Sequence, residues 1–171
     1  MQERKTEYLV ERAKKQDSEA FTELMQLYVK DMYKVGIAIL KNDADVADAM
    51  QDTILSCWEK LNSLKQNKYF KTWMIRILIN QCYQLQRKNK IYTGFDESVV
   101  TGYEDSYNLE FKEALDTLED KYRVIMILFY VQGYRIPEIS AILKIPKSTV
   151  QTRLFRGRKQ LAKYYDESKK R

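Results

Sequence analysis

The chain of 171 residues contains no histidine, two prolines, five glycines and two cysteines. So few prolines and glycines leave little material for the turns of an all-β protein, and long stretches without either favour helix nearly throughout. The chain also lacks a glycine-rich phosphate loop and a nucleophile placed beside a base, so no catalytic set is visible. We therefore expect an all-α binding protein that is not an enzyme and that needs no metal and no cofactor.

The two cysteines, Cys57 and Cys82, both fall within apolar helical patterns. This placement indicates reduced core residues rather than a disulfide or a metal-binding pair. No uncharged apolar run approaches membrane-spanning length, and the charged N-terminus, MQERKTEYL, is unlike a signal peptide. We expect a cytoplasmic protein without direct membrane insertion.

Charge divides the chain into three blocks. Residues 1–90 hold 16 Lys and Arg against 12 Asp and Glu, residues 91–120 hold 1 against 9, and residues 121–171 hold 13 against 3. The excess of positive charge in residues 121–171 makes a compact domain repel itself, which favours a polyanionic partner such as nucleic acid. Two basic blocks around an acidic, irregular segment predict two domains, residues 1–90 and 108–171, joined by a linker over residues 91–107.

The first domain is predicted to contain four helices, because apolar residues recur with a helical period in four stretches. The stretches are Thr6–Lys15, Phe21–Ile39, Val46–Leu61 and Tyr69–Lys90. Asp17 and Asn42 precede the second and third stretches and are predicted to be N-caps. The expected core residues of the last two helices include Val46, Met50, Ile54, Cys57, Trp58, Phe70, Trp73, Met74, Ile77, Leu78, Cys82 and Leu85.

An acidic stripe runs along the third stretch. Asp45, Asp48 and Asp52 recur at intervals of three and four residues, with Gln51 beside them. A solvated face whose negative charge favours a helix N-terminus explains this pattern as well as a partner-docking face does. The stripe alone therefore leaves both interpretations open.

Polar and basic residues interleave with aromatic rings along the fourth stretch. The polar strip consists of Arg76, Asn80, Gln84, Arg87 and Lys88. Such a surface suits single-stranded nucleic acid, since rings stack on bases while cations hold phosphates. For Trp73, a position in the core is at least as well supported as a role as a stacking platform.

The second domain is predicted to form around a buried central helix over Tyr122–Gln132, which Gly133 ends. An apolar helix over Ile136–Leu143 follows, and the break at Lys144-Ile145-Pro146 separates it from a last, basic helix. That last helix is expected to begin with a capping box formed by Ser148 and Gln151 and to bury Val150, Leu154 and Leu161.

A short apolar helix followed by a basic one is the helix-turn-helix arrangement, whose second helix enters a DNA major groove. The alternative is an αα-hairpin with a solvated charged face, and the charge excess favours DNA. The side chains expected to face outward are Gln151, Thr152, Arg153, Phe155, Arg156, Arg158 and Lys159.

Three segments together resemble a known family. They are DADVADAMQDTILSCWEKL, FKTWMIRILINQ and ALDTLEDKYRVIMILFYVQGYRIPEISAILKIPKSTVQTRLFRGRKQL. In this order and spacing they closely resemble the extracytoplasmic-function sigma factors of the sigma-70 family. The resemblance implies an alternative sigma factor that binds the clamp coiled coil and the flap of core RNA polymerase. It also implies recognition of promoter −35 and −10 elements, as duplex and melted single strand, with assistance to promoter melting.

The resemblance further implies roles for individual residues. The polymerase-docking residues are Asp45, Asp48, Gln51 and Asp52. The −10 element, including a flipped base, is assigned to Lys65, Asn67, Lys68, Tyr69, Lys71, Trp73, Arg76, Asn80, Tyr83 and Arg87. The −35 element is assigned to Lys147, Ser148, Gln151, Thr152, Arg153, Phe155, Arg156 and Arg158. An anti-sigma factor, often membrane-anchored in the family, is the expected regulatory partner.

Two other classes of function remain as alternatives. A stand-alone helix-turn-helix regulator binds duplex DNA without polymerase, usually as a dimer on paired half-sites. Such a regulator requires neither the acidic stripe nor the aromatic fourth helix. A nucleic-acid-modifying enzyme is more distant, because the scattered carboxylates form no convincing cluster.

Overall fold

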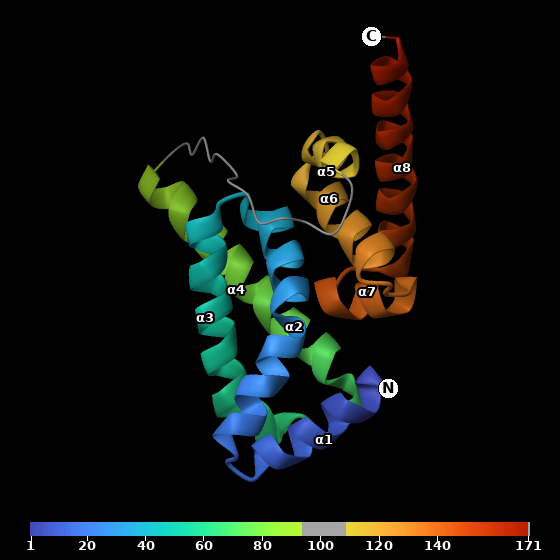
Figure 1. Cartoon of the computed structure of the whole chain (residues 1–171). Coiled ribbons are helices and arrows are strands. Elements are labelled where there is room, and N and C mark those ends of the chain that lie inside the picture. Colours follow the sequence, from blue (N-terminus) through green and yellow to red (C-terminus); the bar gives the residue numbers. More distant parts are fainter. Residues whose placement is uncertain (94–108, 171) are drawn as a thin grey trace. The chain divides into compact units, whose positions relative to one another are not determined.

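The computed structural model describes residues 1–93 and 109–170, and these residues contain helices and turns but no strand. The chain divides into two compact units, Met1–Ser98 and Val99–Arg171 (Figure 1). The predicted all-α class with two small helical domains is thereby confirmed. Beyond Thr93, the predicted linker over residues 91–107 lies outside the described residues, and the domain boundaries stay a prediction.

The described part of the first unit consists of four helices and two short 3-10 turns. They are α1 (Gln2–Lys14), α2 (Ser18–Leu40), α3 (Asp43–Lys60), η1 (Leu61–Ser63), η2 (Asn67–Tyr69) and α4 (Phe70–Thr93). Helix α2 packs against α1, α3 and α4, and α3 packs along α4 (Figure 1). Helix α4 extends three residues past its predicted end at Lys90, up to the residue before Gly94.

Two predicted N-caps accept hydrogen bonds from backbone amides at the starts of α2 and α3. The Asp17 side chain accepts a hydrogen bond from the Ala20 amide at 3.1 Å, and that of Asn42 accepts one from Asp45 at 3.1 Å. Both predictions are confirmed. The Ala20 amide and the neighbouring Arg12 guanidinium, which donates to Asp17 from Nε at 2.9 Å, lower the pKa of this carboxyl.

The buried side of α3 is made of smaller residues than the sequence predicted. Val46, Ala49, Thr53 and Cys57 are buried, whereas Met50, Ile54 and Trp58 are only half-buried. The cause is a close approach between helices, because a Cβ atom on Gly36 of α2 would lie 3.0 Å from Val46 Cγ1. Val46 of α3 therefore packs closely on Gly36 of α2, while the larger residues of α3 stay partly exposed.

A similar shift affects α4. Ile75 and Ile79 are fully buried together with Phe70, Met74, Leu78 and Cys82. The predicted core residues Trp73, Ile77 and Leu85 are half-buried instead. Because α4 packs against both α2 and α3, two adjacent helical faces are covered and the buried stripe is wider than a single 3.6-residue repeat indicates.

The described part of the second unit is also helical. It consists of α5 (Leu109–Asp116), α6 (Asp120–Met126), the π-helical segment η3 (Ile127–Val131), α7 (Ile136–Leu143) and α8 (Lys147–Lys169). The predicted central helix is thus α6 and η3, and Gly133 with a φ of 74° ends it as expected. Arg123 of α6 is only 2% exposed, and it donates to the Leu118 carbonyl at 2.8 Å and pairs with Asp120.

Among the residues that the structure describes, no helix is both long and apolar enough to cross a membrane. The Cys57 and Cys82 thiols are free and lie in the core of the first unit. Burial raises the pKa of each thiol to about 12, which disfavours the reactive thiolate.

We expect both thiols to resist alkylation in the native chain. At about pH 8 a thiol with this pKa is ionised on the order of one part in ten thousand, and its access is blocked as well. Intact-mass spectrometry after iodoacetamide should show no adduct on the native chain and two adducts on the chain unfolded in guanidinium. Labelling of either thiol at the rate of a free cysteine would contradict the burial.

Candidate nucleic-acid interface

Helices α7 and α8 form the predicted helix-turn-helix. Lys144 adopts a left-handed φ of 55° and ends α7, and the Ser140 hydroxyl donates to the Ile145 carbonyl at 2.6 Å across the turn. The predicted capping box is wrong, because Pro146 is the N-cap of α8 and no side chain caps this helix. Ser148 lies one residue inside the helix, too far along it to act as the N-cap.

The inner side of α8 is a narrow stripe. Val150, Leu154, Gly157 and Leu161 are buried. A Cβ atom on Gly157 would lie 3.1 Å from the sulfur of Met126 in α6, so the two helices are in close contact. This confirms the predicted burial of the three apolar residues and leaves the opposite side of α8 facing solvent.

The outer side of α8 carries six of the eight residues that were assigned to duplex DNA. These six residues, all of them exposed, are Lys147, Ser148, Gln151, Thr152, Phe155 and Arg156. Phe155 is 65% exposed, which serves no purpose in the packing of its own unit. An outward phenyl ring beside hydrogen-bonding side chains matches the pairing of apolar and polar contacts found at base edges in a major groove.

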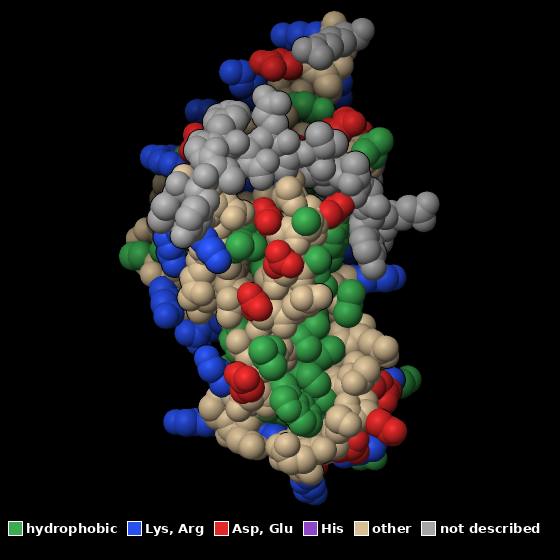
Figure 2. All heavy atoms as spheres, turned by 90° about the vertical axis from the view of Figure 1, so that its left-hand side faces the viewer, with side chains coloured by type: hydrophobic (Ala, Val, Ile, Leu, Met, Phe, Trp, Pro, Cys, Tyr) green, Lys and Arg blue, Asp and Glu red, His purple; other side chains and the backbone are tan. Residues whose placement is uncertain are grey.

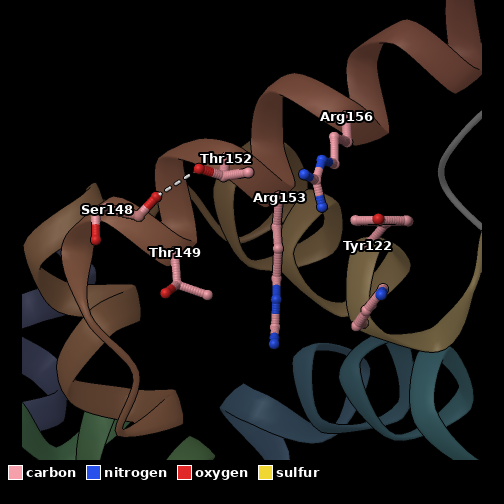
Figure 3. A pocket seen from close by; sticks show the side chains of 7 residues that line it. Tyr122, Ser148, Thr149, Thr152, Arg153 and Arg156 are labelled. Carbon is pink, nitrogen blue, oxygen red and sulfur yellow. Dashed lines mark hydrogen bonds between the residues drawn. The ribbon is translucent and has the colours of Figure 1, made fainter.

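The remaining two residues of that set have other surroundings. The Arg158 guanidinium lies 5.5 Å from the ring centroids of both Phe129 and Tyr130 and donates to the Tyr130 hydroxyl. Arg153 is half-buried and lines a hollow between α6 and α8 (Figure 3). The structure therefore does not bring all eight residues onto one surface.

In the first unit, α1 holds the loop that precedes α4. The Lys14 ammonium donates to the Leu64 carbonyl at 2.6 Å and to Asn67 Oδ1 at 2.7 Å. Leu64 is buried, whereas the neighbouring Lys65 and Lys68 are exposed. The sequence did not indicate this contact, because Lys14 is one of many surface cations and lies 50 residues before Leu64.

Aromatic and polar side chains continue from this loop along α4. Tyr69 is 52% exposed, with the Lys68 ammonium 5.0 Å from its ring centroid. Trp73 packs one side against Phe70, at 5.9 Å between ring centroids, and is half-buried, so it is neither a core tryptophan nor a free ring.

The five residues of the predicted polar strip on α4, namely Arg76, Asn80, Gln84, Arg87 and Lys88, are all exposed. Trp73, Arg76, Asn80, Tyr83 and Arg87 follow one another at intervals of three or four residues and lie on one side of the helix. Arg76, Asn80 and Arg87 are exposed, and Tyr83 is half-buried. Lys71, at the start of α4, is half-buried and lies 3.9 Å from an Asp31 carboxylate oxygen.

The outer face of α3, defined here as Asp48, Gln51, Asp52 and Leu55, is exposed. Figure 2, which views the α3 side, shows acidic side chains in a row beside hydrophobic ones. Leu55 is 57% exposed among these polar residues, and the sequence did not single it out. Asp45 is half-buried and accepts a hydrogen bond from Asn89 of α4 at 3.0 Å, so it takes part in the packing of the unit.

Comparisons with known proteins bear on both units of the chain. Residues 24–91 match the family described as Sigma-70 region 2, and residues 108–161 match Sigma-70, region 4. SigW of Bacillus subtilis, described as an ECF RNA polymerase sigma factor, is 29% identical over 90% of this chain and 93% of its own length. The chain belongs to the extracytoplasmic-function sigma factors of the sigma-70 family.

Two solved structures have a similar fold. The sigma factor RpoE of Bartonella quintana, in complex with the anti-sigma factor NepR, aligns with a TM-score of 0.75 and 24% identity over 85% of this chain and 96% of its own. CnrH, in complex with the cytosolic domain of CnrY, aligns with a TM-score of 0.71 and 22% identity over 95% and 98% of the two chains.

This sigma factor is an alternative sigma factor for transcription initiation. Its region 2 match lies within the first unit and includes α3 and nearly all of α4, and its region 4 match lies within the second and includes the helix-turn-helix. A stand-alone helix-turn-helix regulator is not favoured, because it does not account for the region 2 match. Lys14 precedes the matched residues, which is a further reason why motifs did not reveal it.

We expect Lys14→Met to loosen the loop before α4. The substitution keeps an apolar side chain of similar length but removes two hydrogen bonds from a charged donor, and so lowers the free energy of unfolding by about 1–2 kcal/mol. Hydrogen–deuterium exchange should show faster amide exchange for the peptide covering residues 64–69 than in the wild type.

The matched control is Lys15→Met. Lys15 is exposed and only forms an ion pair with Glu11 at 3.6 Å, so its loss should leave the same peptide unchanged. Equal exchange of this peptide in all three proteins would show that Lys14 does not hold the loop.

Proposed function

We propose that this sigma factor binds core RNA polymerase through the outer face of α3, reads the −35 element with α8 and captures the melted −10 element along α4 and its preceding loop. The polymerase performs the chemistry, and this chain has no catalytic activity of its own. The observation that carries the proposal is the outward placement of Phe155, Tyr69 and Leu55, which are large apolar side chains with half or more of their surface exposed. Each lies among polar or charged residues on a surface assigned to a partner.

Recognition of the −35 element rests on the outer side of α8. Gln151 and Arg156 provide the amide and guanidinium groups that pair with adenine and guanine edges in a major groove. Phe155 lies between them in sequence and offers apolar contact to a thymine methyl group. Lysine and hydroxyl side chains of the first turn supply phosphate contacts, which position the helix without specifying sequence.

Capture of the −10 element rests on the first unit. Taking a base out of the duplex costs a few kcal/mol. Stacking on an aromatic ring such as Tyr69 or Trp73 returns about 1–3 kcal/mol per base, and Arg76 and Arg87 provide charge for the phosphates. Because these groups bind only the unpaired strand, their binding energy favours the open duplex. Asn67, whose side chain accepts a hydrogen bond from Lys14, lies in the loop before α4 and offers a further hydrogen-bonding group.

Docking to the polymerase is assigned to two surfaces. The outer face of α3 combines two carboxylates with an exposed leucine, a combination that suits a basic and apolar partner such as the clamp coiled coil. The second unit is assigned to the flap. An anti-sigma factor, which in the family is often membrane-anchored, is proposed to occupy the same surfaces, because the sigma factor RpoE of similar fold was solved with the anti-sigma factor NepR.

Transcription in vitro tests the proposal. Core polymerase with this chain, supplied with a library of promoter fragments, should give discrete new start sites, and fragments that lack either element should give none. The chain without core polymerase should produce no RNA. Random starts at the level of core polymerase alone would refute the proposal.

We expect charge reversal on the outer face of α3, Asp48→Lys with Asp52→Lys, to weaken the complex with core polymerase about tenfold or more. Both carboxylates are exposed, so the thermal unfolding of the chain should change little. Affinity is measured by competition against a labelled sigma factor for core polymerase.

The matched control carries the same change of charge on α1, Glu7→Lys with Glu11→Lys. These two carboxylates are also exposed and lie outside the proposed docking surface. The control should retain wild-type affinity. Equal weakening by both pairs would attribute the effect to net charge, and no weakening by either would remove the docking role from α3.

A further inference from the structure

A polar hollow lies between α6 and α8 in the second unit. Its volume is about 290 Å³, and it is lined by Lys121, Tyr122, Ser148, Thr149, Thr152, Arg153 and Arg156. Lys121 and Tyr122 belong to α6 and the other five residues to the first turns of α8, and Figure 3 shows the Arg153 side chain extended away from α8. The walls thus combine three cations, three hydroxyl groups and the ring of one tyrosine.

The charge of this hollow is not balanced within the described part of the chain. There, neither Arg153 nor Arg156 forms an ion pair or a side-chain hydrogen bond, although Arg153 is half-buried. Lys121 has a carboxylate neighbour, Glu119, at 3.6 Å, but both side chains are largely exposed and such a pair is weak. Guanidinium groups without a carboxylate partner repel one another, and a bound anion would relieve that repulsion.

Hydrogen-bond donors surround the same space. The first turn of α8 has no side-chain cap, so its initial amides lack a side-chain acceptor and its N-terminal partial charge is positive. The Thr152 hydroxyl donates to the Ser148 carbonyl at 2.9 Å, which leaves the hydroxyl oxygen of Thr152 as an acceptor only. The Ser148 and Thr149 hydroxyls and the Arg153 guanidinium then match the several oxygens of a phosphate, while Arg156 adds positive charge at the rim.

We propose that this hollow seats a single backbone phosphate of the DNA duplex. The proposal rests on the proposed function of α8, because Thr152 and Arg156 belong both to the hollow and to the side of α8 assigned to base contacts. A duplex whose bases reach that side brings a strand of its backbone alongside the hollow. Lys121 is thereby a DNA contact from outside the helix-turn-helix, and the seated phosphate fixes the position of α8 in the groove without specifying sequence.

Neutralisation of single phosphates tests this proposal in the complex of the chain with core polymerase. Duplex promoter fragments carry one methylphosphonate at successive backbone positions of the −35 element, and affinity is measured by competition. For the wild type we expect one position at which neutralisation lowers affinity about tenfold, the loss expected for a charge-assisted contact. In Arg153→Gln the same neutralisation should cost nothing further, since the contact is already lost.

Three further variants control the result. Arg153→Lys keeps the charge and should retain most of the sensitivity at that position, and Lys121→Gln should reduce it. Lys169→Gln removes a cation from the last turn of α8, roughly 24 Å along the helix from Arg153, and should leave the pattern unchanged. Loss of Arg153 should also weaken binding equally to cognate and scrambled −35 sequences and reduce the salt slope by about one.

The proposal would be overturned if, at every backbone position, neutralising the phosphate lowered the affinity of Arg153→Gln by the same factor as that of the wild type. Circular dichroism must show that the variant is folded. Stronger displacement of DNA by inorganic phosphate than by chloride at equal ionic strength, without any coupled position, would assign the hollow to a free anion and would also overturn it. Both outcomes leave promoter-specific transcription intact, so they are distinct from a failure of the proposed function.

Discussion

The rotation of α8 about its own axis is fixed by its close contact with α6. With Gly157 against Met126, a larger residue at this point would require the Met126 side chain to move, and Val150, Leu154 and Leu161 are buried along the same side of α8. Once this narrow stripe is buried, the remaining side chains of the first turns can only point toward solvent or into the hollow beside α6. The surface proposed to read DNA therefore consists of the α8 side chains that the core leaves exposed.

The first unit follows the same principle. Gly36 lets α3 approach α2 closely, so that small residues face inward and Asp48, Asp52 and Leu55 face outward. Helix α4 packs against both α2 and α3 and therefore buries a wide apolar stripe. Its remaining exposed residues form the aromatic and basic strip. Because each proposed surface consists of side chains that the core does not need, charge reversal there should affect binding more than folding.

Much of the fold followed from periodicity and local chemistry. The helices, both N-caps in the first unit and the break between α7 and α8 depend on residues close together in the chain, where spacing is informative. The phase of the buried stripe in α3 and α4 was harder to predict, because Ala49 and Thr53 carry little apolar signal and are buried only through a neighbour. A periodic pattern defines a face, but the packing partner decides where that face is centred.

In the candidate sites too, features that depend on neighbouring residues were predicted and contacts between distant residues were not. The outer side of α8 was predicted nearly complete, since each of its residues is one helical step from another. The contact of Arg158 with Tyr130 and that of Lys14 with Asn67 join residues 28 and 53 positions apart, and no local pattern contains them. Ser148 was misplaced because the start of α8 depends on the left-handed turn at Lys144, which composition does not reveal.

Promoter opening tests the central claim most directly, namely that this chain, bound to core polymerase, reads the −35 element with α8 and captures the melted −10 element along α4. Permanganate reactivity of thymines in the −10 element reports strand separation base by base. The account predicts reactive thymines with core polymerase and this chain together on a promoter that has both elements, and none with either protein alone. Equal reactivity with core polymerase alone, or an unopened duplex in the complete mixture at a promoter that the complex binds, would contradict it.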